Sequence, residues 1–133
     1  MPERFPPEHP REWLNRATSA LALAKARADD VYLEDLCYQA QQAVEKAIKA
    51  LLIHRGAEFS YVHDIGQLLT ELEWAGEEIP EEVRRAERLT RFAVFTRYPV
   101  PAPPVTPSEW AEAVALAERV VNWAGSKVSG GEE

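Results

Sequence analysis

The chain has 133 residues, of which 46% are hydrophobic and 28% are charged, and its formal net charge at pH 7 is −7. This length suits a single domain, and the composition is that of an ordinary globular protein. The negative charge disfavours a general nucleic-acid-binding protein, because such proteins usually present a basic surface. No apolar run approaches the ~18 residues of a membrane span, and the N-terminal segment lacks the apolar core of a signal peptide. We therefore expect a cytoplasmic protein that is not embedded in a membrane.

Apolar residues recur at helical spacing along the chain, which predicts five helices and no strand. The first helix follows Pro10. The second runs from about Tyr32 to His54, with Asp29 and Asp30 able to cap its start, and it stops at Gly56. After a short loop over residues 57–62, the third helix ends at Gly76, where a glycine suits a left-handed turn. The residues predicted to form the core are Trp13, Val44, Ile48, Leu51, Leu68, Leu72, Val114 and Val121.

Two further helices are marked by proline and by a capping motif. Pro80 fits the first turn of the fourth helix, which must finish before Pro99. Residues 106–109, Thr-Pro-Ser-Glu, form a capping box that begins the fifth helix. Residues 126–133, SKVSGGEE, are expected to be a disordered tail, which leaves a domain over residues 1–125. The fold class is thus an all-α, up-and-down antiparallel bundle of four main helices plus one additional helix.

Two predicted helix faces carry residues that suit contact with another molecule. On the second helix a polar stripe lies away from the apolar face, and on the fourth helix phenylalanines fall beside arginines that have no i,i+4 partner. Exposed Phe beside Arg is typical of a protein interface or of a platform for a nucleotide base, and the negative net charge favours the protein interface. The candidate interface residues are Tyr38, Gln42, Glu45, Lys49, Arg84, Arg88, Phe92 and Phe95.

A candidate polar site combines His63, Asp64, Arg97 and Tyr98. If the fourth helix keeps its period, Arg97 faces inward and needs a carboxylate or carbonyl partner, which Asp64 can supply. The alternative is structural: Asp64 stabilises the start of the third helix, and His63 packs in the preceding loop.

Other chemistry is not indicated. The one cysteine, Cys37, lies on an apolar helix face, which fits an inert core thiol in a reducing compartment. The three histidines lack metal-ligand spacing, and there is no phosphate-binding glycine loop or nucleophilic triad motif. We predict neither a metal nor a cofactor. Few thermolabile residues and ten prolines are typical of a thermophile.

The helix over residues 35–56, His63-Asp64, and Thr96-Arg97-Tyr98-Pro99 together resemble the HEPN domain family, from about Trp13 to Trp123. The resemblance implies a small prokaryotic helical bundle, often encoded beside a minimal nucleotidyltransferase. In many members an arginine followed four to six residues later by a histidine forms an endoribonuclease site at a dimer cleft. Here the stretch after Arg97 contains no histidine, and neither Arg85, Arg88 nor Arg91 has one in range.

We therefore expect a non-catalytic HEPN protein that forms a homodimer or tetramer and binds a separately encoded minimal nucleotidyltransferase. By resemblance, it would help that enzyme to bind its substrate or serve as one half of a toxin–antitoxin pair. One alternative is a metal-independent ribonuclease that combines Arg97 with His63 or Tyr98. Another is a module that binds a nucleotide or RNA through the arginines and phenylalanines of the fourth helix.

Overall fold

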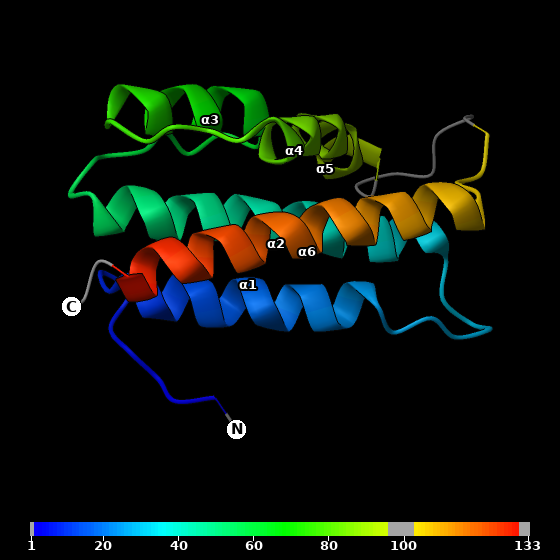
Figure 1. Cartoon of the computed structure of the whole chain (residues 1–133). Coiled ribbons are helices and arrows are strands. Elements are labelled where there is room, and N and C mark those ends of the chain that lie inside the picture. The colour runs from blue at the N-terminus through cyan, green and yellow to red at the C-terminus, as the bar shows by residue number, and fades with distance from the viewer. Residues whose placement is uncertain (1, 96–102, 131–133) are drawn as a thin grey trace.

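The structure is a computed structural model that describes residues 2–95 and 103–130, and this part of the chain contains helices but no strand (Figure 1). The elements are α1 (Pro10–Ala24), α2 (Leu33–His54), α3 (Ile65–Trp74), α4 (Glu81–Arg84), the 3₁₀ helix η1 (Arg85–Arg91), α5 (Phe92–Phe95) and α6 (Pro107–Gly130). The predicted all-helical bundle is confirmed. Among the helices described, none is both long and apolar enough to cross a membrane.

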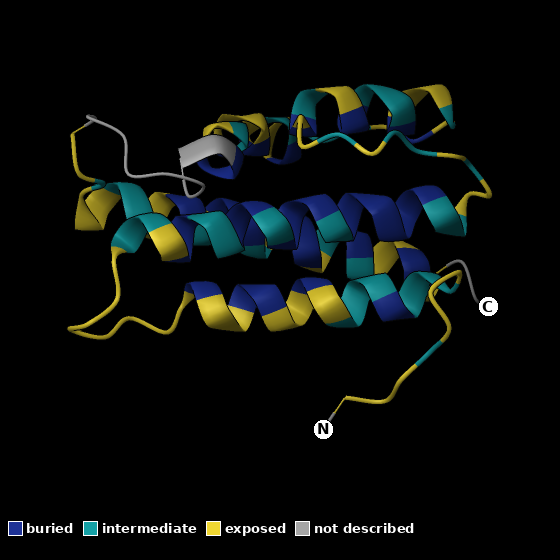
Figure 2. Cartoon of the chain, turned by 180° about the vertical axis from the view of Figure 1, so that it is seen from behind, coloured by how far each residue is buried: buried dark blue, intermediate teal, exposed yellow. Residues whose placement is uncertain are grey.

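Helix α2 lies at the centre of the bundle. It contacts α1, α3, η1, α5 and α6, with α1 on one side of it and α3 to α5 on the other (Figure 1). Seen from behind, α2 is buried along almost its whole length (Figure 2). Its alanines Ala40, Ala43, Ala47 and Ala50 have no exposed surface, and such small residues let neighbouring helix axes approach closely.

The predicted core is largely confirmed. Val44, Ile48, Leu51, Leu68 and Leu72 are fully buried, and Val121 is 7% exposed. Val114 is partly buried and packs against this core from its edge, whereas Trp13 is partly buried and meets the ring of Phe59. The helical periodicity therefore identified the faces of α2, α3 and α6 that meet.

The helix ends predicted at Gly56 and Gly76, and the helix start predicted at the capping box, are also present in the structure. Gly56 and Gly76 have φ values of 70° and 100°, in the left-handed region that favours glycine. At the start of α6, the backbone N–H of Glu109 donates to Thr106 Oγ1 at 3.1 Å, and the Thr106 N–H donates to Glu109 Oε1 at 3.0 Å. This reciprocal pair fixes where α6 begins.

The second helix begins about where it was predicted to begin, but its predicted capping residues are wrong. The residue that caps α2 is Tyr32, which makes no side-chain capping hydrogen bond. Asp29 and Asp30 lie three and two positions earlier, in the exposed loop between α1 and α2. A capping carboxylate must be the residue at the cap itself to reach the N–H groups of the first turn, so these two are out of register.

The predicted disordered tail is also wrong over residues 126–130. Helix α6 continues to Gly130, and Val128 is only 1% exposed. Val128 lies four residues after the buried Ala124, so it extends the apolar face of α6 by one more turn. The glycine-rich composition of the segment concealed that one apolar position.

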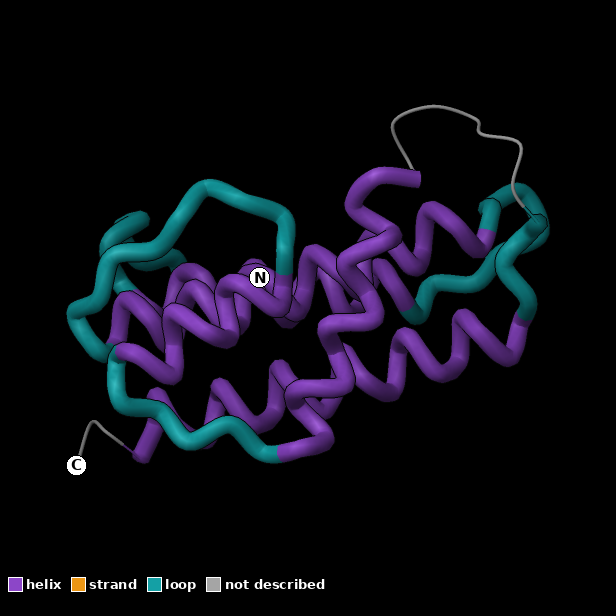
Figure 3. The backbone as a smooth tube through the Cα atoms, turned by 90° about the horizontal axis from the view of Figure 1, so that it is seen from above, coloured by secondary structure: helices purple, strands orange, loops and turns teal. Residues whose placement is uncertain are grey.

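The predicted fourth helix is present as a composite of α4, η1 and α5, which crosses the long helices obliquely (Figure 3). Its 3₁₀ portion explains why Phe92, predicted on an interface, is instead 1% exposed and part of the core. A 3₁₀ helix turns by about 120° per residue and an α-helix by about 100°, so seven residues of η1 accumulate roughly 140° of extra rotation. That rotation carries Phe92 inward. The side chain of Phe95 lies outside the described residues.

The connection between α2 and α3, residues 57–64, runs back along α2, and we call it the strap. Its beginning follows Arg55, whose guanidinium donates to the carbonyl of Ala75 at the end of α3. Its end brings His63 to Glu45, more than two turns earlier on α2. Helix α3 therefore runs in the same direction as α2, and the strap covers a face of α2 that a short loop would have left open.

Candidate functional site

A polar cluster surrounds the carboxylate of Glu45, whose side chain is 3% exposed. Lys49 Nζ lies 3.1 Å from Glu45 Oε1. The amides of Gln41 and Gln42 both donate to Oε2, the latter at 3.2 Å. His63 Nδ1 lies 3.2 Å from each carboxylate oxygen. We call these five residues the Glu45 cluster, and it is formed by α2 and the end of the strap.

The helical repeat brings Gln41, Glu45 and Lys49 together, because residues four positions apart lie on one face of a helix. The predicted Glu45–Lys49 pair is present. Its predicted place on a surface open to another molecule is wrong, because both residues are buried and Tyr38 and Gln42 are half-buried. Sequence periodicity predicted that the apolar face of α2 is buried. In the structure the polar face that carries Glu45 and Lys49 is buried as well, because the bundle and the strap together cover both faces.

Aromatic rings hold the cation of Lys49 from its other side. Lys49 Nζ lies 5.9 Å from the ring centroid of Trp13 and 5.4 Å from that of Phe59. These two rings meet edge to face, with centroids 5.7 Å apart, and Phe59 meets Tyr61 in the same way at 5.8 Å. A buried ammonium group needs such partners, and here a carboxylate and two ring faces supply them. Sequence analysis did not assign Gln41 or Phe59 to this site.

His63 is the exposed member of the cluster, with 54% of its side chain open to solvent. The Glu45 carboxylate pairs with Lys49 and accepts amide hydrogens, so it can only accept from the imidazole. His63 therefore carries its proton on Nδ1 in the neutral form, which leaves Nε2 with the lone pair. A carboxylate that orients an imidazole in this way suits it to proton transfer through Nε2.

The structural interpretation of Asp64 is confirmed. Asp64 caps α3, and its Oδ1 accepts the backbone N–H of Gln67 at 3.2 Å. Arg97 and Tyr98 lie outside the described residues. The proposed ion pair between Asp64 and Arg97 therefore stays a prediction, and so does the polar site that would join His63 to Arg97.

Three of the four arginines of α4 and η1 are paired with carboxylates of neighbouring helices. The pairs are Arg84–Glu73, Arg88–Glu112 and Arg91–Glu109. Arg84 and Arg88, which lack a partner within their own helix, thus find one on α3 and on α6. The Thr106 backbone N–H, the Thr106 hydroxyl and Arg91 hold the pKa of the Glu109 carboxyl below its usual value. Charge on this face is therefore largely neutralised within the chain.

An arginine followed by a histidine at the ribonuclease spacing does occur at Arg4 and His9, which sequence analysis overlooked. There the imidazole caps α1: His9 Nδ1 accepts the backbone N–H of Arg11 at 3.1 Å. Its ring also stacks on Phe5, with centroids 4.8 Å apart. Capping and stacking give His9 a structural role at the start of the bundle.

Among the side chains that the structure describes, three large aromatic ones are mostly exposed. Tyr61 on the strap is 92% exposed, Trp74 at the end of α3 is 82% exposed, and Tyr32 before α2 is 77% exposed. Tyr61 ends the row of rings that begins at Trp13, so the strap presents it next to the Glu45 cluster. Exposed Trp and Tyr of this kind are the residues that most often anchor protein interfaces.

Comparison with known proteins assigns the fold to a family. The family model for the HEPN domain matches residues 10–128, which include the Glu45 cluster but not Arg4 or His9. The crystal structure of TT1696 from Thermus thermophilus is similar, with 32% sequence identity and a TM-score of 0.78 over 89% of this chain and 97% of that one. The crystal structure of ST0689, an archaeal HEPN homologue, is similar at 25% identity and a TM-score of 0.70, over 90% and 98% of the respective chains. No functionally curated protein matches the chain.

Proposed function

Because the chain belongs to the HEPN domain family, we propose that it is a non-catalytic HEPN protein whose task is to bind another protein. The proposed partner is a separately encoded minimal nucleotidyltransferase. The chain would act as a homodimer or tetramer that helps this enzyme to bind its substrate, or as one half of a toxin–antitoxin pair. The family resemblance suggests the partner, and the surface chemistry of the chain supports a protein rather than a polyanion.

The observation that carries the proposal is the contrast between paired arginines and exposed aromatics. A ribonuclease needs free guanidinium groups to hold phosphate, yet Arg84, Arg88 and Arg91 each face a carboxylate. Tyr61 and Trp74 meanwhile expose most of their surface to solvent. Such side chains contribute most when a partner protein buries them.

The test is a binding measurement with the purified minimal nucleotidyltransferase from the same genome. We expect a complex by size-exclusion chromatography with light scattering. Tyr61→Ala and Trp74→Ala should each weaken it by roughly tenfold or more. Tyr32→Ala is the matched control, because Tyr32 is similarly exposed but lies at the opposite end of α2. If no complex forms, or if Tyr32→Ala weakens it equally, the proposed surface is wrong.

Self-association needs a separate measurement. We expect a dimer or a tetramer at micromolar concentration, since symmetric homo-oligomers are the common form of association. Light scattering of the chain alone measures this directly. A purely monomeric species would contradict the oligomeric part of the proposal and leave partner binding to be judged by the complex.

One observation favours a second candidate, a metal-independent ribonuclease: the Glu45 carboxylate orients His63 for proton transfer. Under the first proposal, purified protein should not cleave RNA above background, with divalent metal or with a chelator. The enzyme would be established instead if RNA is cut and if both His63→Ala and Arg97→Ala abolish cutting while circular dichroism shows an intact bundle.

A further inference from the structure

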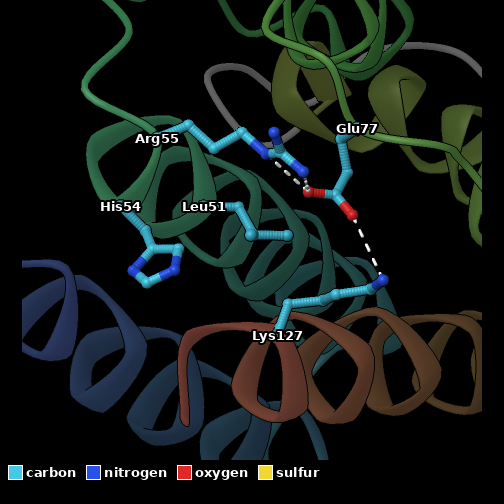
Figure 4. A pocket seen from close by; sticks show the side chains of 5 residues that line it. All are labelled: Leu51, His54, Arg55, Glu77 and Lys127. Atoms are coloured by element: carbon cyan, nitrogen blue, oxygen red, sulfur yellow. Dashed lines mark hydrogen bonds and ion pairs between the residues drawn. The ribbon is translucent and has the colours of Figure 1, made fainter. Parts of the chain in front are cut away.

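A hollow of about 360 Å³ opens where α2 and α6 end, about 15 Å along α2 from Glu45. Figure 4 shows the side chains that surround it. Leu51, His54 and Arg55 come from the end of α2, Glu77 from the segment after α3, and Lys127 from the last turns of α6. Lys127 reaches this hollow only because α6 continues through the segment that was predicted to be a disordered tail.

Among the described residues that line the hollow, the charges do not cancel. Arg55 Nε and Arg55 Nη2 lie 2.8 and 2.7 Å from Glu77 Oε2, and Lys127 Nζ lies 3.3 Å from Glu77 Oε1. One carboxylate, 4% exposed, therefore holds two cations, which leaves one positive charge in excess. This excess is local, since the chain as a whole carries −7. It marks the hollow as a place where an anion is favoured.

Contacts within the chain restrain the guanidinium of Arg55 in the absence of a ligand. Its Nη1 donates to the carbonyl of Ala75 at 3.3 Å. Gly76 adopts a φ of 100°, and a Cβ at that position would lie 3.1 Å from Arg55 Nη1. The turn therefore packs closely against the guanidinium and limits its movement, which lowers the entropic cost of binding to it.

Donors remain after the internal bonds are made. Arginine has five N–H donors and lysine has three. Glu77 and Ala75 engage three from Arg55, and Glu77 engages one from Lys127. Within the described part of the chain, two hydrogens on each side chain are left, and His54 adds a ring nitrogen at the edge of the hollow (Figure 4).

We propose that this hollow binds a phosphate group, either free orthophosphate or the phosphate of a small phosphomonoester. Phosphate oxygens accept hydrogen bonds from arginine and lysine in the geometry that such donors favour. The volume is at the small end of the range for ligand sites, and Leu51 is the one apolar residue among the described residues of its lining. The phosphate itself, rather than a group attached to it, must then supply most of the binding. This function is separate from the protein-binding surface proposed above.

The test is calorimetric titration of the full chain with sodium phosphate, against sodium chloride of matched ionic strength. Lys127→Met should weaken phosphate binding by about tenfold or more, the effect of losing a hydrogen bond to a charged group. Lys25→Met is the matched control, because Lys25 is also about half exposed and pairs with Glu118 on α6 at 3.1 Å, away from the hollow. His54→Gln gives a second variant that leaves the Glu77 ion pairs intact, and it should weaken phosphate binding less than Lys127→Met does.

Glu77→Gln tests the sign of the effect. If Glu77 competes with the phosphate for the two cations, removing its charge should strengthen phosphate binding several-fold, even though the loss of ion pairs lowers the thermal midpoint. If Arg55, Glu77 and Lys127 have a purely structural role, Glu77→Gln should lower the thermal midpoint without any gain in phosphate affinity. That result, or equal phosphate binding by wild type and Lys127→Met, would overturn the proposal, as would no binding at about 10 mM phosphate.

Two further ligands identify the source of the phosphate. Adenosine 5′-monophosphate that binds more tightly than orthophosphate would point to a phosphomonoester, and the reverse order would point to free phosphate. Adenosine should not bind. Adenosine binding as tightly as its monophosphate would show that the hollow recognises something other than phosphate, and would overturn the proposal.

Discussion

The Glu45–Lys49 pair allows a quantitative test of the buried cluster. The side chains are 3% and 11% exposed and 3.1 Å apart. Removing one partner of such a pair leaves a buried charge without compensation, which typically costs about 3–5 kcal/mol. For a chain of this size that loss corresponds to a fall in Tm of roughly 10–20 °C. Lys49→Met should cost less than Glu45→Met, because Gln41, Gln42 and His63 continue to donate to the carboxylate, whereas without Glu45 the ammonium of Lys49 keeps only aromatic partners.

The measurement is urea unfolding followed by circular dichroism for wild type, Glu45→Met, Lys49→Met and the double variant. Replacing both partners with apolar residues of similar volume removes the uncompensated charge, so the double variant should be more stable than Glu45→Met. The exposed Lys25–Glu118 pair is the control, and Lys25→Met should change the free energy of unfolding by less than about 1 kcal/mol. If the two single changes add within about 0.5 kcal/mol, the pair is not coupled and the reasoning fails.

Three other outcomes follow from burial and capping. Phe92→Ala should lower the free energy of unfolding by about 3–5 kcal/mol, and a loss under about 0.5 kcal/mol would mean that the ring is exposed after all. Thr106→Ala should cost about 1 kcal/mol through loss of the cap of α6, which urea unfolding measures, and Ser108→Ala at an exposed neighbouring position should not. Burial raises the pKa of the Cys37 thiol from 9.0 to about 11, so the folded state keeps a proton that the unfolded state loses. The free energy of unfolding should therefore be unaffected by this thiol below pH 9 and should fall as pH rises from 9 to 11, and Cys37→Ala should lack that fall.

The sequence predicted the helices and most of the core because those features depend on local spacing. The faces that bury Val44, Leu51 and Leu72 each repeat at helical period, and the capping box at Thr106 marks the start of α6 by itself. Phe92 was misplaced because its position depends on whether seven preceding residues wind as a 3₁₀ or an α-helix. Nothing in that stretch of sequence distinguishes the two, and packing against α2 and α6 decides between them.

The candidate site was predicted only in part, since its members come from distant parts of the chain. Glu45 and Lys49 are linked by helical spacing, and that pair is present. Their contact with His63 depends on the strap running back along α2, and a loop's path cannot be read from residue spacing. The hollow at Arg55 depends in the same way on an arrangement of three helix ends, so no local pattern indicated it.

The fully buried alanines of α2 limit how this protein can evolve. Positions 40, 43, 47 and 50 have no exposed surface, so a larger side chain at any of them cannot extend into solvent. Overpacking of a close-packed core typically costs about 1–3 kcal/mol, and truncating the adjacent large residues opens cavities of similar or greater cost. Random mutagenesis should therefore find α2 the least tolerant helix, while new binding properties should arise at the strap and the outer faces of α3 and α6.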